Sequence, residues 1–206
     1  MNQKIIKNTL ILTAITLISG LLLGFVYEIT KEPIAASREN RKQEAYHTVF
    51  QEAETFQTFE AFEEKEAEEI LRNAGVSGCY VNEATLALDS GENAIGSVVT
   101  ATSKEGYGGE IKVSVGITLD GTVTGIELLS ISETAGLGMN AQEPEFKEQF
   151  QDVNTDYFEV VKGDGGKEGK IDALSGATIT TDAVTNAVNA AVAYYHGAME
   201  GGSVNE

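Results

Sequence analysis

The longest apolar stretch of the chain lies near its amino terminus. Nineteen consecutive residues from Thr9 to Tyr27 carry no charge. As an α-helix they would be about 28 Å long, close to the thickness of a bilayer's hydrocarbon core. A secretory signal has a shorter apolar centre, and Ala35 and Ala36 offer only a loose cleavage site. We therefore predict one uncleaved transmembrane helix over residues 9–27, after a tail of residues 1–8.

The segment that follows has a helical pattern. Residues 34–50 contain neither Gly nor Pro. Phe56, Phe59 and Phe62 recur at a spacing of three, which suits one face of a helix. We therefore predict a helical stalk over residues 28–72 that leads from the membrane into a folded domain.

A strict alternation of apolar and polar residues begins further along the chain. Residues 111–119 place Ile, Val, Val, Ile and Leu on one face of a strand. Asp120 and Gly121 follow at once and are the preferred pair for a tight hairpin turn. Residues 122–131 form the returning strand, with Gly125 as a predicted bulge because the alternation slips there.

The remaining patterns complete an α+β domain. We predict further strands at 94–103 and 158–161, and a helix at 142–151. A last helix is marked by apolar residues at helical spacing from Val184 to Tyr195, with Thr181 as its expected cap. The predicted fold is a curved antiparallel sheet with packed helices over residues 73–197, followed by a flexible tail at 198–206.

Charge is distributed unevenly along the chain. The formal net charge is −18, and residues 1–50 are net +2 whereas residues 51–206 are net −20. An acidic body repels phosphate backbones, so we expect no nucleic-acid partner. Eight acidic residues lie between Glu52 and Glu69, a run far more typical of a solvated helix surface than of a metal site.

The content of cysteine and histidine excludes several cofactor sites. Cys79 is the only cysteine, so the chain by itself can form neither an intrachain disulfide nor a four-thiolate iron–sulfur site. His47 and His196 lie far apart in the sequence, which makes a zinc site improbable. Any redox work would therefore need an organic carrier, and Cys79 is best interpreted as a small buried residue.

Three glycine-punctuated segments carry the candidate chemistry. They read GYGG at residues 106–109, SETAGLG at residues 132–138 and DALSGATIT at residues 172–180. Taken singly, the first two are most simply strand ends and turns. Glycines at the ends of neighbouring strands also let a flat ligand approach the backbone closely.

The third segment is more informative because it stands just ahead of the last helix. Small neighbours leave the hydroxyl of Thr178 uncrowded, and the unpaired N–H groups of a helix start favour a phosphate. The segment is not a P-loop, since no Lys follows the glycine at the required place. From these residues alone, two interpretations are about equally supported: a binding site for a phosphorylated ligand or a phosphoester on Thr178, and an ordinary helix cap.

Residues 172–180 resemble the attachment motif of the covalent FMN-binding domain family. In that family a flavin transferase esterifies the phosphate of FMN to the threonine of an S/T-G-A-T motif. Residues 133–138, ETAGLG, are similar to the family's E-T-P-G-L-G loop, and GYGG before a long hairpin also fits. Ala135 replaces the usual proline, so we expect a less rigid loop.

The resemblance extends over the whole chain. One amino-terminal span and about 200 residues resemble the G subunits of Rnf electron-transport complexes, which are ion-translocating ferredoxin:NAD⁺ oxidoreductases. The C subunits of sodium-translocating NADH:quinone reductases share the motif but are typically longer, which makes them the runner-up. A non-redox, single-pass extracytoplasmic binding module stays open as an alternative from another class.

The resemblance implies a role for each matching residue. Thr178 would hold FMN covalently, and we expect the isoalloxazine ring to keep its redox chemistry. The other implied residues fall into groups: Ser175, Gly176 and Ala177 at the phosphate seat, Asp172 for transferase recognition or turn support, Glu133, Thr134, Leu137 and Gly138 along the ring, and Tyr107 and Gly108 nearby. The sequence shows no acid–base or nucleophile–base pair, so we expect neither an independent catalytic site nor a metal site.

The resemblance also implies a location and partners. Residues 1–8 would lie in the cytoplasm and the carboxy-terminal domain outside the cell membrane, an orientation that the charges flanking the span do not decide. The partners would be other Rnf subunits and, during maturation, the flavin transferase.

Overall fold

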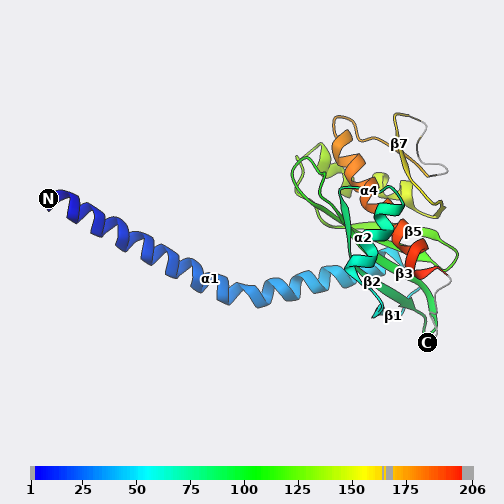
Figure 1. The fold of residues 1–206 in the computed structure, drawn as a ribbon, viewed down its shortest axis with the longest axis horizontal. Helices are drawn as coiled ribbons and strands as arrows, with labels where there is room; N and C mark the ends of the chain where they lie inside the picture. Colours follow the sequence, from blue (N-terminus) through cyan, green and yellow to red (C-terminus); the bar gives the residue numbers. More distant parts are fainter. Residues whose placement is uncertain (1–2, 164, 166–168, 201–206) are drawn as a thin grey trace. The chain divides into compact units, whose positions relative to one another are not determined.

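The computed structural model describes residues 3–163, 165 and 169–200 of the 206-residue chain. The chain forms two compact units, residues 1–42 and 43–206 (Figure 1). The first unit is helical throughout its described part, whereas the second contains the sheet and all of the glycine-rich segments.

Helix α1 (Gln3–Val49) contains the predicted transmembrane segment and continues well beyond it. Among the described residues, α1 is the one helix long and apolar enough to cross a membrane. Its large apolar side chains are exposed: Leu10 is 65% exposed, Leu21 74% and Leu23 73%. None of the described residues covers this surface, which is what a lipid-facing helix requires.

The second unit contains a six-stranded antiparallel sheet whose strands lie in chain order. The predicted antiparallel α+β architecture is therefore confirmed. The strands are β1 (Thr55–Thr58), β2 (Cys79–Leu88), β3 (Ala94–Ser103), β4 (Ile111–Thr118), β5 (Thr122–Ser130) and β6 (Val153–Asn154).

The hairpin of β4 and β5 follows the sequence pattern closely. Gly121 adopts a φ of +84° in the turn, and its N–H donates to the carbonyl of Thr118 at 3.0 Å. The register shifts between the pairs made by Gly125 and Val123, so the predicted bulge lies where the alternation slips. The apolar side chains of β4 are completely buried, whereas Leu119 lies past the strand end and is 53% exposed.

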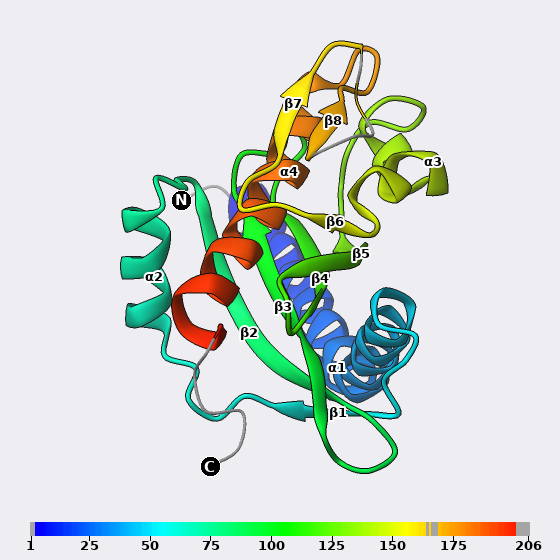
Figure 2. The same ribbon diagram turned by 90° about the vertical axis from the view of Figure 1, so that its right-hand side faces the viewer.

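Helix α4 (Thr178–Tyr194) packs across β2, β3 and β4 and covers one face of the sheet (Figure 2). The apolar residues that predicted this helix are buried. The helix starts three residues earlier than its expected cap. The hydroxyl of Thr181 instead donates to the carbonyl of Ala177 and accepts the N–H of Leu174, each at 3.0 Å, so Thr181 braces the turn from within the first helical turn.

The other face of the sheet is covered by the end of α1. Tyr46, Val49 and Phe50 are 1%, 2% and 3% exposed and pack against Ala87 and Val98 of the sheet. Both faces of the sheet are therefore covered, and the compact unit begins at residue 43 rather than at residue 73.

The prediction of a helical stalk over residues 28–72 was wrong in two respects: residues 50–63 are not helical, and residues 43–72 belong to the folded unit. Phe56 lies on β1, which pairs with β2, and its ring lies 5.3 Å from that of Tyr46. Helix α2 (Glu64–Asn73) then packs Ala67 and Leu71 into the core. The spacing of phenylalanines suggested a helix, but strand pairing and ring contacts in the folded unit decide the conformation, as tertiary context overrides a weak local pattern.

Two smaller expectations also need correction. The strand predicted at 158–161 exists as β7 (Glu159–Val161), but it pairs in parallel with β8 (Lys170–Asp172) and lies outside the main sheet. The predicted helix at 142–151 is divided into short turns, because Pro144 starts a new helical turn: η1 (Gly138–Gln142), α3 (Pro144–Lys147) and η2 (Glu148–Phe150).

The carboxy-terminal end stays packed beyond the predicted domain limit. After α4 the turn η3 (Tyr195–Met199) keeps Tyr195 and Met199 buried against the core. Within the predicted flexible tail, residues 198–200 are therefore ordered, and residues 201–206 lie outside the described residues.

Candidate functional site

The three glycine-rich segments meet in one place. They belong to the loop between β3 and β4, the loop after β5 and the turn that enters α4. Together they surround a cavity of about 640 Å³ lined by Tyr107, Glu133, Thr134, Leu137, Gly138, Gly176, Ala177, Thr178, Ile179 and Thr180. Segments far apart in the sequence thus form a single site.

Eight of the eleven residues predicted from the sequence line this cavity, and three do not. Tyr107, Glu133, Thr134, Leu137, Gly138, Gly176, Ala177 and Thr178 line it, and Gly108 contacts it through Glu133. Asp172 and Ser175 line a separate cavity of about 420 Å³ on another side of the turn. Ser175 therefore lines a different cavity from Gly176, the next residue of the same turn.

Thr178 occupies the first position of α4 and is exposed to solvent. No side chain among the described residues caps this helix start, so the N–H groups of its first turn keep their capacity to bind an anion. The helix dipole adds a partial positive charge at the same point. These donors would favour a phosphate joined to the hydroxyl of Thr178.

The turn before Thr178 needs a glycine for a conformational reason. Gly176 has a φ of +74°, a backbone conformation that residues other than glycine rarely adopt. A Cβ at this position would also lie 3.3 Å from Leu137 Cδ2, across the cavity. The turn can therefore approach the loop after β5 closely.

Glu133 connects the three loops through its carboxylate. Its Oε1 accepts the N–H of Gly108 at 3.0 Å, and its Oε2 accepts the hydroxyl of Thr180 at 3.1 Å. The side chain is half-buried. A lone loop acid is usually only solvated, but this one holds the loop between β3 and β4 to the first turn of α4.

The loop at 133–138 is held by its own backbone. The N–H groups of Leu137 and Met139 both donate to the carbonyl of Thr134, at 3.1 and 3.2 Å, and the side chain of Asn140 donates to the carbonyl of Gly136 at 3.4 Å. These bonds order the loop even though Ala135 stands where the resembling family has proline.

Two glycines of the site are required by contacts within the protein. A Cβ on Gly108 would lie 2.0 Å from the carbonyl oxygen of Ser132, and a Cβ on Gly138 would lie 2.5 Å from Thr180 Oγ1. The sequence suggested close approach by a ligand. The structure shows instead that these loops approach one another.

The sequence reasoning did not select two residues that line the cavity, Ile179 and Thr180. Ile179 is 54% exposed beside Thr178, and Thr180 is 2% exposed and bonds Glu133. Thr180 is part of the recognised nine-residue motif and could have been chosen as a hydroxyl neighbour of Thr178. Ile179 carried no signal, because only the fold brings its side chain to the cavity.

Asp172 has a structural environment of its own. Its backbone N–H donates to Gln149 Oε1 at 2.6 Å, and one of its carboxylate oxygens is buried with no hydrogen-bond partner among the described residues. It ends β8 and begins the turn that leads to Thr178. The hydrogen bond to Gln149 is made by the backbone, so the role of the Asp172 side chain, transferase recognition or turn support, stays a prediction.

Cys79 lies away from the cavity, on β2, and behaves as a packing residue. Burial raises the pKa of its thiol to about 11, a hydrogen bond with Ser103 opposes that shift, and the charge of Glu105 adds to it. A thiol held in its protonated form is a poor nucleophile. Within the described residues, no group of three or more His, Cys, Asp and Glu side chains is arranged to hold a metal ion.

Comparison with known proteins places these features in a wider context. Residues 106–193 match the model of the FMN-binding domain, and residues 1–49 match that of the RnfG N-terminal region. The G subunit of the proton-translocating ferredoxin:NAD(+) oxidoreductase complex of Clostridium ljungdahlii is 36% identical over 88% of this chain and 86% of its own. The G subunit of the Na(+)-translocating ferredoxin:NAD(+) oxidoreductase complex of Acetobacterium woodii is 32% identical over 94% and 92%.

A solved structure also resembles the chain, at a lower level. The crystal structure of Shewanella oneidensis NqrC aligns with 56% of this chain and 58% of its own, with 21% sequence identity and a TM-score of 0.48.

Proposed function

Because the chain belongs to the family of Rnf-complex G subunits, we propose that it carries FMN bound covalently through a phosphoester to Thr178. At the level of the family, the chain is an FMN-binding electron-transfer subunit of an Rnf complex. The runner-up family and the non-redox binding module are therefore set aside. The observation that carries the proposal of attachment is the position of Thr178, exposed at an uncapped helix start and facing the cavity of about 640 Å³.

The residues present fit a flavin joined through its phosphate. The uncapped first turn of α4 supplies N–H donors and a positive dipole end for the phosphate. Leu137 and Tyr107, 42% and 73% exposed, provide apolar and aromatic surface at the cavity for a planar ring. FMN would supply the redox chemistry of its isoalloxazine ring, which attachment through the phosphate leaves unmodified.

The protein's own contribution is to hold the flavin and to orient it. A covalent bond at Thr178 prevents loss of the cofactor by dissociation, and the Glu133 bonds to Gly108 and Thr180 hold the surrounding loops in one arrangement. The residues that line the cavity would hold the carrier, and the substrates would belong to the complex as a whole.

The experiment is to co-express the full chain with a flavin transferase and to examine it on a denaturing gel. Wild-type protein is expected to show a fluorescent flavin band, and its Thr178 peptide a mass increase of FMN minus one water. Thr178→Ala is expected to lose both signals. Thr48→Ala serves as the matched control, because Thr48 lies on α1 and away from the cavity, and it should keep both.

Two results would contradict the proposal. One is wild-type protein with no flavin after successful co-expression, and the other is a Thr178→Ala protein that keeps its covalent flavin. A flavin that is present but released by denaturation would leave the family function in place and reject the phosphoester.

The remaining features of the proposal concern location and partners. Residues 9–27 of α1 would cross the cell membrane, with residues 1–8 in the cytoplasm and the flavin domain outside. Other Rnf subunits are the partners that membership of the family supports. A flavin transferase would act on the domain during maturation. Labelling of a cysteine introduced at an exposed position of the domain, in intact cells, would test the orientation.

A further inference from the structure

A second hollow adjoins the cavity proposed for the flavin. It has a volume of about 440 Å³ and shares Ile179 with the first cavity. The hollow lies where the loop after β3, the start of β7 and one face of α4 come together, and we call it the acidic socket: Glu105, Tyr157, Phe158, Glu159, Val160, Ile179, Asp182, Thr185 and Asn186.

The charge of the acidic socket is not balanced. Glu105, Glu159 and Asp182 reach it from three different segments, and none of the described residues that line it is Lys, Arg or His. Burial raises the pKa of the Asp182 carboxyl, and the neighbouring charge of Glu105 raises it further. Carboxylates that repel one another are stabilised by any cation placed between them.

A second and independent feature is an unpartnered hydroxyl. Thr185 is 2% exposed, and its Oγ1 has no hydrogen-bond partner among the described residues. It lines the acidic socket one turn along α4 from Asp182. A buried oxygen without a partner is costly, and a donor that entered the socket would satisfy it. Asn186 already orients Glu105 by donating to its Oε2 at 3.3 Å.

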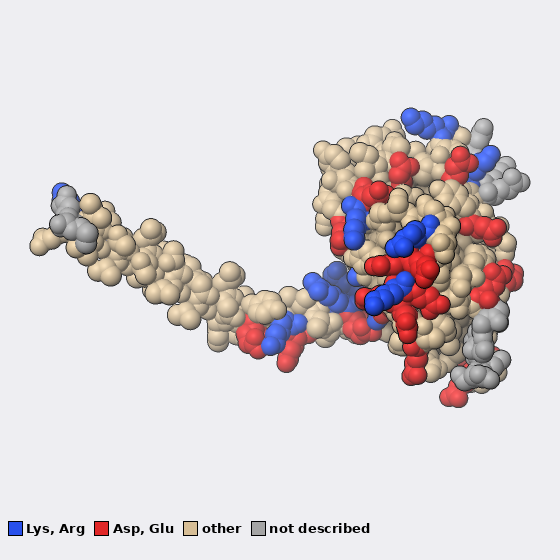
Figure 3. All heavy atoms as spheres, viewed as in Figure 1, with Lys and Arg blue, Asp and Glu red and all other residues tan. Residues whose placement is uncertain are grey.

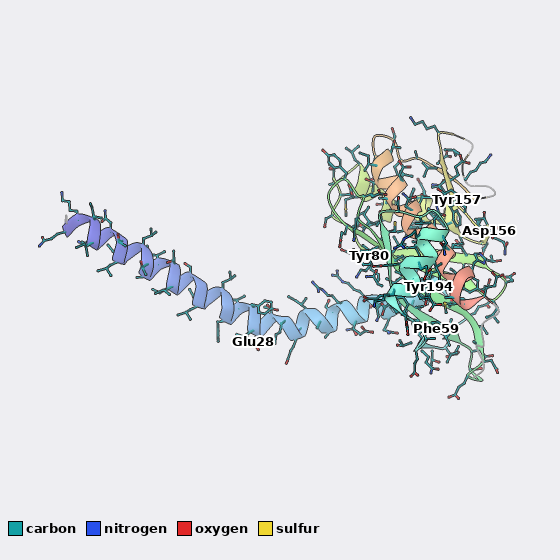
Figure 4. All side chains as sticks on the ribbon, in the orientation of Figure 1. Glu28, Phe59, Tyr80, Asp156, Tyr157 and Tyr194 are labelled. Carbon is teal, nitrogen blue, oxygen red and sulfur yellow. The ribbon has the colours of Figure 1, made fainter. Side chains whose placement is uncertain are left out.

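The walls of the socket also provide flat and apolar surface. Tyr157 and Ile179 are 57% and 54% exposed, although both side chains are large and apolar over most of their surface. Tyr157 lies beside Asp156 on the segment that enters β7 (Figure 4). An aromatic face beside carboxylates binds the stem of a long cationic side chain as well as its charged end.

A metal ion fits these observations less well than a long side chain. A bound cation needs several oxygen ligands within about 2.0–2.6 Å, and no group of three or more His, Cys, Asp and Glu among the described residues is arranged to provide them. A guanidinium group has five N–H donors spread over a plane and can reach carboxylates that lie further apart.

We propose that the acidic socket receives an Arg or Lys side chain of the protein that exchanges electrons with this subunit, and so docks that protein beside the flavin. The inference rests on the proposed flavin site, with which the socket shares Ile179.

The test uses the flavin-loaded subunit within its assembled complex. Reduction of its flavin is followed by stopped-flow absorbance at low and at high salt, for wild type and for the triple variant E105Q/E159Q/D182N. The triple variant is expected to be about tenfold slower at low salt and to lose most of the salt dependence, because the charges that steer and hold a basic partner are gone.

A matched control removes the same number of charges elsewhere. Acidic side chains also gather over α2, where Glu64, Glu68 and Glu69 are exposed (Figure 3). The variant E64Q/E68Q/E69Q should keep the wild-type rate and its dependence on salt. If this control slows as much as the socket variant, the effect comes from net charge, and the proposal is overturned.

Other outcomes decide the remaining alternatives. An unchanged rate and salt dependence in the socket variant, with the flavin still attached, would overturn the docking proposal and leave the flavin proposal intact. A melting temperature that rises with added Ca²⁺ in wild type but not in the socket variant would assign the socket to a metal ion instead. Absence of flavin from the wild-type subunit would be a failure of the flavin proposal, and the gel band reports it separately.

Discussion

Thr180 donates its hydroxyl to Glu133 Oε2 at 3.1 Å, and this bond ties the first turn of the last helix to the loop after β5. The other oxygen of the same carboxylate accepts the N–H of Gly108. One side chain therefore sets the positions of all three segments around Thr178. An acid that would usually be solvated in a loop is thus the residue that connects the site.

Replacement of Glu133 by Ala should loosen this arrangement. Both hydrogen bonds to the carboxylate are lost, and we expect the free energy of unfolding to fall by about 1–2 kcal/mol, since the side chain is only half-buried. Urea unfolding measures this loss. A flavin held at Thr178 should also become more mobile, seen as a lower fluorescence anisotropy. Glu60→Ala, at an exposed position away from the cavity, should change neither quantity. Equal behaviour of the two variants would contradict the bracing role.

Replacement of Gly108 by Ala should destabilise the protein for a steric reason. The added Cβ would lie 2.0 Å from the carbonyl oxygen of Ser132, so the loop must move and lose its bond to Glu133. We expect a cost of about 1–3 kcal/mol in unfolding experiments. Tyr107→Ala changes an exposed neighbour in the same loop and should cost less than about 0.5 kcal/mol. A Gly108→Ala protein as stable as wild type would show that the contact with Ser132 is easily relieved.

Deletion from the amino terminus should locate the start of the folded unit. Removal of residues 1–42 should leave a cooperatively folding body, whereas removal of residues 1–54 should abolish cooperative unfolding. The longer deletion takes away Tyr46, Val49 and Phe50, which cover one face of the sheet, and burial of each such side chain contributes about 1.5–3 kcal/mol. Thermal unfolding followed by circular dichroism distinguishes the two proteins. If both unfold with the same midpoint, the amino-terminal cover is dispensable.

The thiol of Cys79 should react slowly in the folded protein. Its pKa is raised to about 11, so the reactive thiolate at pH 8 is about 100-fold scarcer than in an unfolded chain. Iodoacetamide labelling with and without denaturant measures this difference. Labelling at the same rate in both states would show that the thiol is accessible and ionised.

The same pKa shift predicts a dependence of stability on pH. Between about pH 9 and about pH 11 the unfolded state releases the proton of this thiol while the folded state keeps it. The unfolded state then binds fewer protons, so the stability that the protonated thiol contributes is full below pH 9 and falls as the pH rises. Cys79→Val should show a smaller loss of stability than wild type across this interval.

The local sequence was sufficient to predict a helix or strand wherever one hydrophobic pattern dominates. The apolar stretch in α1, the strands β3, β4 and β5 with their turn at Gly121, and the apolar face of α4 all follow from the spacing of side chains. The motif at residues 172–180 and the loop at 133–138 predicted the family, and comparison with known proteins confirmed it, because specific residues at fixed spacing identify a family better than composition does.

The local sequence was insufficient to predict the conformation of a segment that pairs with residues far away in the chain. The segment from residue 50 to residue 63 contains acids and regularly spaced phenylalanines, yet β1 forms there because β2 offers backbone hydrogen bonds. The strand at 159–161 pairs with β8 in a separate sheet, and no feature of its own sequence specifies that partner.

The sequence by itself thus determined the class of fold, a helix long and apolar enough to cross a membrane, and the residue proposed to hold the flavin, because each depends on residue types at short spacing. Only the tertiary structure decided that Glu133 braces the site, that Asp172 and Ser175 lie in a different cavity, and that Glu105, Glu159 and Asp182 share a hollow beside Ile179. These relationships join residues tens of positions apart, and they follow from how the loops pack at one end of the sheet and of α4. Pairing across such distances has no signature in a local pattern, since it is set by the packing of the whole unit.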